Sequence, residues 1–396
     1  MVLVVALVAT AVAWTSLRDT PYVAPTPDDP APRPLTTEAA RTLDRLASAL
    51  EAGDEQAAGD LAPDDDAEAQ ALLTALSANA RELRLSDVDL RYVDEEAVGE
   101  AGAWVASVAA QWQLPEDERV TEMEIHVRLV AAGAEVRVLG FAGGDGSRTP
   151  VWLSGPARVL RSDDVLVIDQ AGEGRRTLRL AARALPVVQR VLPDWQGPLV
   201  VESPETGAGL DAALGVEGGT FADVAAVTDI VDGSTGPGAP EHVFVNPQVM
   251  ARLTPVGAQV VMNHEAAHVA VGAADADLPL WLLEGFADYV ALRAIRLPAS
   301  TTAAQVVAEV RRDGLPDSLP SDSDFEPTGA RLGAAYEAAW LACVVIAEEA
   351  GEPALVDFYH AVDAGGDLEA ELEGATGLTL AALTGRWQDR LSDLAG

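Results

Sequence analysis

The sequence predicts an α+β protein in which a helix-plus-antiparallel-sheet domain precedes a mostly helical domain with a small sheet. Three observations support this fold class. Apolar residues recur at helical spacing near the start, β-rich runs fill residues 88–155, and long helical patterns dominate after residue 255. A chain of 396 residues, 49% of them hydrophobic, is long enough for two or three globular domains.

The first 35 residues differ from the rest of the chain. Residues 1–17 carry no charge and are almost wholly apolar, which is typical of a signal peptide or of a short membrane anchor. The small residues at 11–13 fit a cleavage site, whereas an uncleaved span normally needs about 20 apolar residues. Residues 18–35 form a proline-rich linker that cannot build a packed core. We therefore expect an extracytoplasmic protein that is either secreted or anchored to the membrane through residues 1–17.

Residues 36–165 are predicted to form an α+β accessory domain. A first helix places Leu43, Leu46 and Leu50 on one face and ends near Gly53, and a second helix follows at about 67–82. Alternating or β-rich runs then predict strands at 88–93, 102–114, 122–130, 134–141 and 149–155. This order resembles the cystatin-like cone of the nuclear-transport-factor-2 superfamily. Members of this superfamily can enclose a ligand pocket, but many act only as spacers or docking modules. We expect the accessory role here, because a fold alone does not define an activity.

Residues 166–396 are predicted to be a second domain that begins with a helix near 175–192. Strand-like segments follow at 198–203, 224–231 and 241–247, and the chain after them is mostly helical. The strand candidate directly upstream of the histidine-rich helix described below is 241–247.

Charge and cysteine content exclude some classes of function. The formal net charge is −37 and all 26 basic residues are arginine, so binding to nucleic acid phosphates is not expected. Cys343 is the only cysteine, so no intramolecular disulfide can form.

The most informative segment is residues 264–288, HEAAHVAVGAADADLPLWLLEGFAD. His264 and His268 lie four residues apart, so a helix presents both imidazoles on one face, where they can bind one Zn²⁺ ion. Glu265 lies between them, in the position of a general base for a metal-activated water. Glu284 is the natural third ligand, and Asp288 follows it at i+4, placed to orient a ligand imidazole. Of the other histidines, His126 is expected on the face of a strand, His242 at the end of a strand, and His360 at a packing or surface position on a late helix.

HExxH followed by an E-G-x-A-x-Y segment with an ExxxD pair resembles the gluzincin zinc peptidases, the thermolysin-like and aminopeptidase-N-like branch. The resemblance covers about residues 175–396. It implies one zinc ion held by His264, His268 and Glu284, with Glu265 as the base and Asp288 bonded to a ligand histidine. It also implies a tyrosine on a later helix that supports the oxyanion. Tyr336 is at a comparable position, and packing in an apolar helix is its alternative role.

The sequence also departs from that branch. The interval from His268 to Glu284 is shorter than in its aminopeptidases, and their glycine-alanine-methionine-glutamate-asparagine strand is absent. Endopeptidase and exopeptidase action therefore both stay open. The expected function is a zinc metallopeptidase acting on a peptide or protein substrate. Its rivals are a non-catalytic, metal-stabilised binding or scaffold protein of the cell envelope, and an acidic interaction protein without metal.

Overall fold

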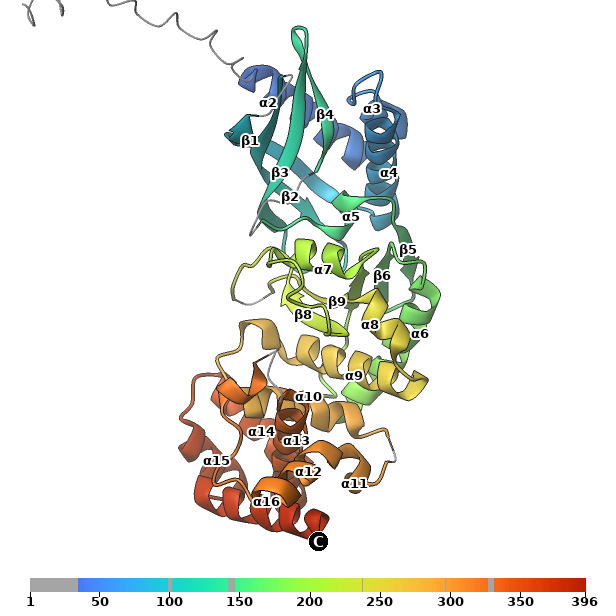
Figure 1. Ribbon diagram of the computed structural model, residues 1–396. Helices are drawn as coiled ribbons and strands as arrows, with labels where there is room; N and C mark the ends of the chain where they lie inside the picture. Colours follow the sequence, from blue (N-terminus) through green and yellow to red (C-terminus); the bar gives the residue numbers. More distant parts are fainter. Residues whose placement is uncertain (1–34, 99–101, 142–146, 237, 296, 327–330) are drawn as a thin grey trace, which may run out of the picture.

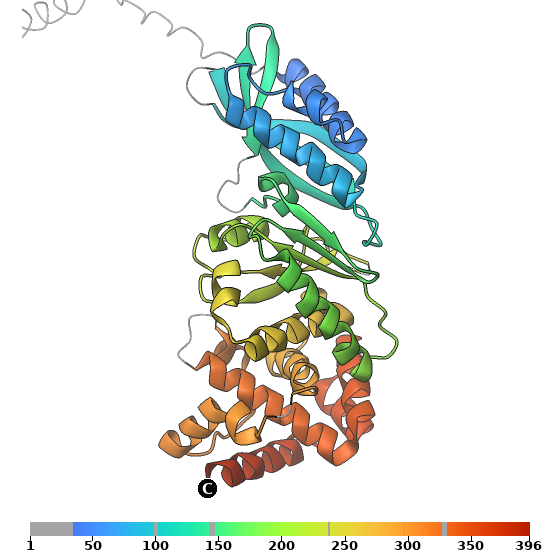
Figure 2. The same ribbon diagram turned by 90° about the vertical axis from the view of Figure 1, so that its right-hand side faces the viewer.

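A computed structural model describes residues 35–98, 102–141, 147–236, 238–295, 297–326 and 331–396. The predictions for residues 1–17 and for nearly all of the linker therefore lie outside the described residues. The described chain stacks three layers along one long axis: an antiparallel sheet with its helices, a second sheet, and a helical layer that ends at the C-terminus (Figures 1 and 2). The predicted α+β class is confirmed. In these ranges, no helix is both long enough and apolar enough to span a bilayer.

The N-terminal layer follows the predicted order of two long helices and a meander. Its elements are α2 (Thr36–Ala52), α3 (Glu55–Gly59), α4 (Ala67–Leu83), β1 (Ser86–Val98), β2 (Ala103–Gln113), β3 (Thr121–Ala132) and β4 (Glu135–Phe141). The strands pair antiparallel in sequence order. Leu43, Leu46 and Leu50 are fully buried, and α2 ends at Gly53 in the left-handed conformation. The apolar stripe of α2 is thus the face that packs on the sheet.

The prediction of a fifth strand in this domain, at residues 149–155, is wrong. Val151–Ser154 form a short helix, α5, after Pro150. The side-chain amide of Asn79 donates to the carbonyls of Trp152 and Gly155, both at 2.8 Å, so side-chain bonds satisfy this backbone in place of a strand partner. A hairpin that sequence patterns did not predict follows, β5 (Arg158–Arg161) and β6 (Val165–Asp169). The boundary predicted between residues 165 and 166 falls inside β6.

The second sheet has the strand order β5-β6-β7-β9-β8. Its remaining strands are β7 (Leu199–Ser203), β8 (Ala226–Ile230) and β9 (Glu241–Val245). Strands β6, β7 and β9 run parallel, whereas β5 and β8 pair antiparallel at the two edges. The segment 241–247 therefore supplies an inner strand, and β8 is the edge strand nearest to the histidine-rich helix. One face of the sheet packs on α6 (Gly174–Val191) and α9 (Pro255–Val271), and the other shares a core with the N-terminal layer and α7 (Gly207–Leu214).

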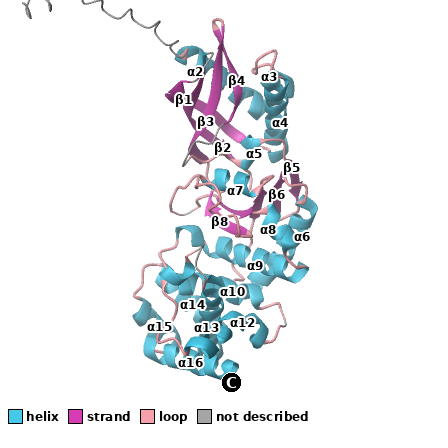
Figure 3. Cartoon of the chain, viewed as in Figure 1, coloured by secondary structure: helices cyan, strands magenta, loops and turns pink. Residues whose placement is uncertain are grey.

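The third layer is helical (Figure 3). Short helices α8 (Pro247–Arg252) and η2 (Ala273–Asp275) flank α9. The layer itself comprises α10 (Leu280–Leu292), α11 (Ala299–Thr302), α12 (Ala304–Asp313), η3 (Asp322–Phe325), α13 (Leu332–Ala350), α14 (Glu352–Asp363), α15 (Leu368–Thr376) and α16 (Leu380–Ala395). Its core holds Trp281, Phe286, Phe358, Tyr359 and Trp387, all nearly or fully buried. The core continues from the lower face of the sheet through α9 and α10 into these helices.

Candidate metal centre

Helix α9 presents the two motif histidines to the interior. The Thr254 side chain caps the helix by accepting from the Gly257 N–H at 3.1 Å, and Pro255 occupies its first turn. The helix ends at Gly272, which adopts the left-handed conformation with φ 68°. Between these ends, His264 and His268 lie one turn apart with ring centroids separated by 4.6 Å. The predicted pairing of the two imidazoles on one helix face is therefore present.

Glu284, on α10, completes a cluster of three ligand atoms. His264 Nε2 and His268 Nε2 lie 2.9 Å apart, and Glu284 Oε2 lies 3.1 Å from the first and 3.4 Å from the second. Bonds of about 2.0–2.1 Å meeting at a tetrahedral angle would separate ligand atoms by about 3.3 Å. The three atoms thus have the spacing of three corners of a zinc tetrahedron. They form the one group of potential metal ligands found among the described residues.

Asp288 fixes the tautomer of the first histidine. Its Oδ1 lies 2.9 Å from His264 Nδ1, so this nitrogen donates its hydrogen to the carboxylate. The opposite nitrogen, Nε2, faces Glu284 Oε2 and His268 Nε2, so it is the nitrogen of His264 that a cation placed between these atoms could bind. Asp288 occupies this place because it lies one helical turn after Glu284 on α10. Its contact with His264 is present, and its role in orienting a metal ligand stays a prediction.

The electrostatics of the cluster favour a bound cation. Burial opposes charge on His264, but the carboxylates of Asp288 and Glu284 outweigh it and raise the pKa of His264 well above its usual value. Burial likewise works against ionisation of Glu284, but the two histidines hold the pKa of that carboxyl well below its usual range. Both shifts arise because carboxylates and imidazoles pair closely in a small, buried volume, which favours the charged form of each group. Two imidazole nitrogens and one carboxylate oxygen, with a carboxylate behind one imidazole, are a donor set that fits Zn²⁺.

Glu265 is not one of the three grouped residues, and its carboxylate contacts strand β8. Its Oε2 accepts a hydrogen bond of 2.8 Å from the hydroxyl of Thr228, which also lies 3.2 Å from the Glu265 carbonyl oxygen. The Glu265 carboxylate is therefore held beside the metal-ligand cluster without belonging to it. Sequence analysis did not identify Thr228, because it lies 37 residues from Glu265 in an ordinary β-rich run. Only the pairing of β8 with β9 brings it to the cluster.

Tyr336, on α13, lies against the same site. Its ring centroid is 6.0 Å from that of His264 and 5.4 Å from that of Phe325. Burial raises the pKa of Tyr336 well above its usual value, and the neighbouring carboxylates, Glu284 first, add to the shift. The side chain therefore stays a neutral hydroxyl that can donate a hydrogen bond. This position is compatible with both predicted roles, packing and oxyanion support.

Gly285 allows α13 to come this close to α10. A Cβ atom at this position would lie 2.5 Å from the carbonyl oxygen of Ala339 and 3.1 Å from Cys343 Sγ. The glycine following Glu284 is thus required by the contact of two helices, since its φ is not in the left-handed region. This close contact lies next to Glu284 on α10, and Tyr336 lies one turn before Ala339 on α13.

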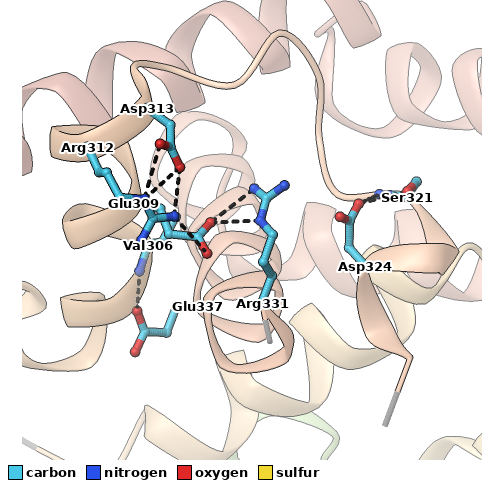
Figure 4. Close-up of polar contacts among 8 residues, drawn as sticks. All are labelled: Val306, Glu309, Arg312, Asp313, Ser321, Asp324, Arg331 and Glu337. Carbon is cyan, nitrogen blue, oxygen red and sulfur yellow. Dashed lines mark hydrogen bonds and ion pairs between the residues drawn. The ribbon is translucent and has the colours of Figure 1, made fainter. Parts of the chain in front are cut away.

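Polar contacts with α12 hold the N-terminal end of α13 (Figure 4). The Glu337 carboxylate accepts from the backbone N–H groups of Gln305 and Val306, at 2.7 and 2.8 Å, and so caps the start of α12. Arg331 pairs with Glu309 of α12 at 3.0 Å. These bonds tie α13 to α12. They fix the helix that carries Tyr336.

Two pockets lie on either side of this arrangement. A pocket of about 280 Å³ opens onto His264, Glu265, Asp288 and Tyr336, and Ala225, Ala226, Val260 and Val261 form its apolar wall. A second pocket, of about 300 Å³, lies between α12, α13 and α16 and touches none of the ligand residues. Of the two, only the first pocket meets the cluster, at His264.

The remaining histidines are not ligands in the described structure. His242 is buried between Glu202 and Asp117, with its ring nitrogens 2.7 and 3.0 Å from the two carboxylates. Asp117 belongs to the turn between β2 and β3, so this cluster joins the N-terminal layer to the second sheet. His126 lies in β3 and His360 in α14, both away from the metal-ligand cluster.

Comparison of the chain with models of known protein families and with curated protein sequences finds no match.

Proposed function

We propose that this protein is a zinc-dependent metallopeptidase. The observation that carries the proposal is the triangle formed by His264 Nε2, His268 Nε2 and Glu284 Oε2, with the Glu265 carboxylate outside it and facing the same open pocket. A ligand set that purely stabilises the fold is closed by a fourth protein ligand, whereas a catalytic set leaves one position for water and substrate. Among the described residues, the group has three members and borders a pocket.

Each side chain has a role in peptide hydrolysis. When bound, zinc polarises the scissile carbonyl and lowers the pKa of water from about 15.7 to about 7. Glu265 accepts the proton of the attacking water and delivers it to the leaving amine. The Thr228 hydroxyl orients the Glu265 carboxylate for that transfer. Tyr336 donates its hydroxyl hydrogen to the oxygen on which negative charge develops.

The substrate we propose is a peptide or protein segment in extended conformation. Strand β8 is an edge strand, and Thr228 within it touches the proposed base. An extended peptide can add to such an edge through main-chain hydrogen bonds. Its scissile bond then lies beside Glu265. We propose no nucleic acid partner, because the net charge is −37.

We further propose that the enzyme works outside the cytoplasm. This rests on the apolar residues 1–17 and the proline-rich linker alone. Secretion after cleavage and anchoring through residues 1–17 are the two forms to distinguish, by the mass and the membrane association of the mature protein.

The test combines metal analysis with a peptide-library assay. The wild type purified without chelators is expected to hold one zinc ion and to cleave casein or members of the library. Glu265→Gln keeps the hydrogen bond from Thr228 and the zinc, but loses hydrolysis by about 10²–10⁴-fold because the amide cannot accept a proton. Glu373→Gln, the same change on the exposed face of α15, is the matched control and keeps full activity.

Two results would contradict the proposal. Stoichiometric zinc without turnover of any peptide pool favours the metal-stabilised binding or scaffold protein. No zinc, together with no loss of melting temperature in EDTA, favours the acidic interaction protein. Unchanged activity of Glu265→Gln would refute the role of that residue.

A further inference from the structure

The open edge of β8 offers few free backbone groups. Asn246 N–H donates to the Ala225 carbonyl, and Val231 N–H donates to the Pro240 carbonyl, at 2.9 Å each. In an antiparallel pair, residues that bond to the partner strand alternate with residues that face away from it. With this register, 225, 227, 229 and 231 face β9, whereas Ala226, Thr228 and Ile230 direct their N–H and C=O groups to the edge.

Both edge-facing groups of Ile230 are already bonded. Its N–H donates to Asp229 Oδ1 at 2.9 Å, and its carbonyl accepts from Arg148 Nη1 at 2.5 Å. Arg148 also donates to the Val231 carbonyl at 3.2 Å and pairs with Asp229 at 2.9 Å. The described residues supply no such partner for the edge-facing groups of Ala226 and Thr228. The free edge is therefore limited to two residues, and it stops directly after the residue that touches Glu265.

The chain beyond Ile230 is also covered. The backbone N–H of Glu122 donates to Asp232 at 3.2 Å, and Arg119 donates to the Thr235 carbonyl at 3.3 Å. Both donors come from the N-terminal layer, which thus lies against the loop that continues β8. A peptide paired with β8 and prolonged past Thr228 would meet Arg148 first and this loop next. The opposite end of the strand, at Ala225 and Ala226, opens into the pocket.

We propose that Arg148 and Asp229 close one end of the substrate groove and make this protein selective for peptides with a short chain on that side of the scissile bond. The inference rests on the proposed peptidase function. In a paired peptide, about every second residue forms hydrogen bonds to an edge-facing residue of the strand. We therefore expect the groove to accept about two peptide residues beyond the one that pairs with Thr228. The N-terminal layer, expected only to be an accessory domain, thereby contributes to the choice of substrate.

The experiment measures kcat/KM on two peptide series built around one cleaved bond. One series is extended residue by residue at the N-terminus, and the other at the C-terminus. The wild type is expected to lose at least tenfold in kcat/KM in one series once the chain exceeds about two residues, because further residues collide with the closed end. In the other series kcat/KM is expected to hold or rise with length.

Two variants test whether the two named residues set the limit. Arg148→Ala frees the Ile230 carbonyl and Asp229→Ala frees its N–H, so each is expected to raise kcat/KM for the long peptides relative to the short ones. A gain of about two- to tenfold corresponds to one main-chain hydrogen bond. Arg158→Ala is the matched control, because Arg158 is exposed on β5 at the opposite edge of the same sheet.

The dependence of wild-type kcat/KM on peptide length tests the inference even if a variant fails to fold. Equal hydrolysis of long and short peptides in both series overturns the inference and leaves the proposed function standing. An unchanged ratio in well-folded Arg148→Ala and Asp229→Ala proteins also overturns it. A wild type that cleaves no peptide overturns the proposed function, and the inference with it.

Discussion

Gly285 is the position where one added methyl group tests the contact between α10 and α13. In Gly285→Ala, the new Cβ would lie 2.5 Å from the Ala339 carbonyl oxygen, whereas ordinary contacts begin at 3.4 Å. The two helices therefore have to separate by about 0.9 Å at their crossing. The neighbour is backbone rather than the end of a flexible side chain, so the strain cannot be relieved by a rotamer change. Overpacking of this kind costs about 1–3 kcal/mol.

The same displacement is expected to impair the site. Glu284 precedes Gly285, and Tyr336 lies one turn before Ala339. Separating the two helices therefore moves Glu284, the proposed metal ligand, away from the hydroxyl of Tyr336. A misplacement of about 1 Å can reduce catalysis by about 10²-fold. We expect Gly285→Ala to bind zinc more weakly and to lose activity beyond what its fraction unfolded explains.

The assay is urea unfolding monitored by tryptophan fluorescence, together with zinc titration. Gly385→Ala provides the matched control, because Gly385 lies within α16 with nothing within 4 Å of its added Cβ. An alanine there should stabilise the helix by about 0.5–1 kcal/mol. The same substitution is therefore expected to lower the free energy of unfolding at position 285 and to raise it at position 385. If Gly285→Ala is as stable as Gly385→Ala and holds zinc normally, the close approach of the two helices is not what positions the site.

Three further results are expected. Asp288→Asn keeps the size of the side chain but loses the charge behind His264, so zinc affinity measured by competition with a chelating dye should fall by about 10–100-fold; unchanged affinity would contradict the orienting role. Tyr336→Phe keeps the ring and should keep zinc, but should lower kcat by about 10²–10³-fold with little change in KM, whereas an unaltered kcat would identify Tyr336 as a packing residue. Burial opposes charge on His242, but its two carboxylate partners outweigh it and raise its pKa to about 10, so its contribution to stability is full below about pH 6.5 and lost as the pH rises toward 10. Unfolding free energies measured between pH 6 and 10 should decline in the wild type and in His126→Gln, and much less in His242→Gln; equal slopes in all three would refute the assignment.

Local sequence patterns were sufficient for the elements that depend on neighbours along the chain. The cap at Thr254-Pro255 and the four-residue spacing of His264 and His268 determine a helix that presents two imidazoles together, because both follow from helix geometry. The ExxxD pair works in the same way, since one turn of α10 separates Glu284 from Asp288. The ligand set was therefore predictable, although its coordination of zinc stays a prediction.

Contacts between distant segments decided the rest. The strand expected at residues 149–155 became a helix because Asn79, more than 70 residues away, satisfies its carbonyls. Thr228 lies in the edge strand β8 and Arg148 bonds to the last residue of that strand, and no local pattern indicates which strand of a sheet will be the edge. The sequence by itself thus determined the helices and the spacing of the metal-ligand residues on them. Only the tertiary structure determined what holds Glu265 and where the open edge of β8 ends, because sheet order is set by long-range pairing and not by residues adjacent in the chain.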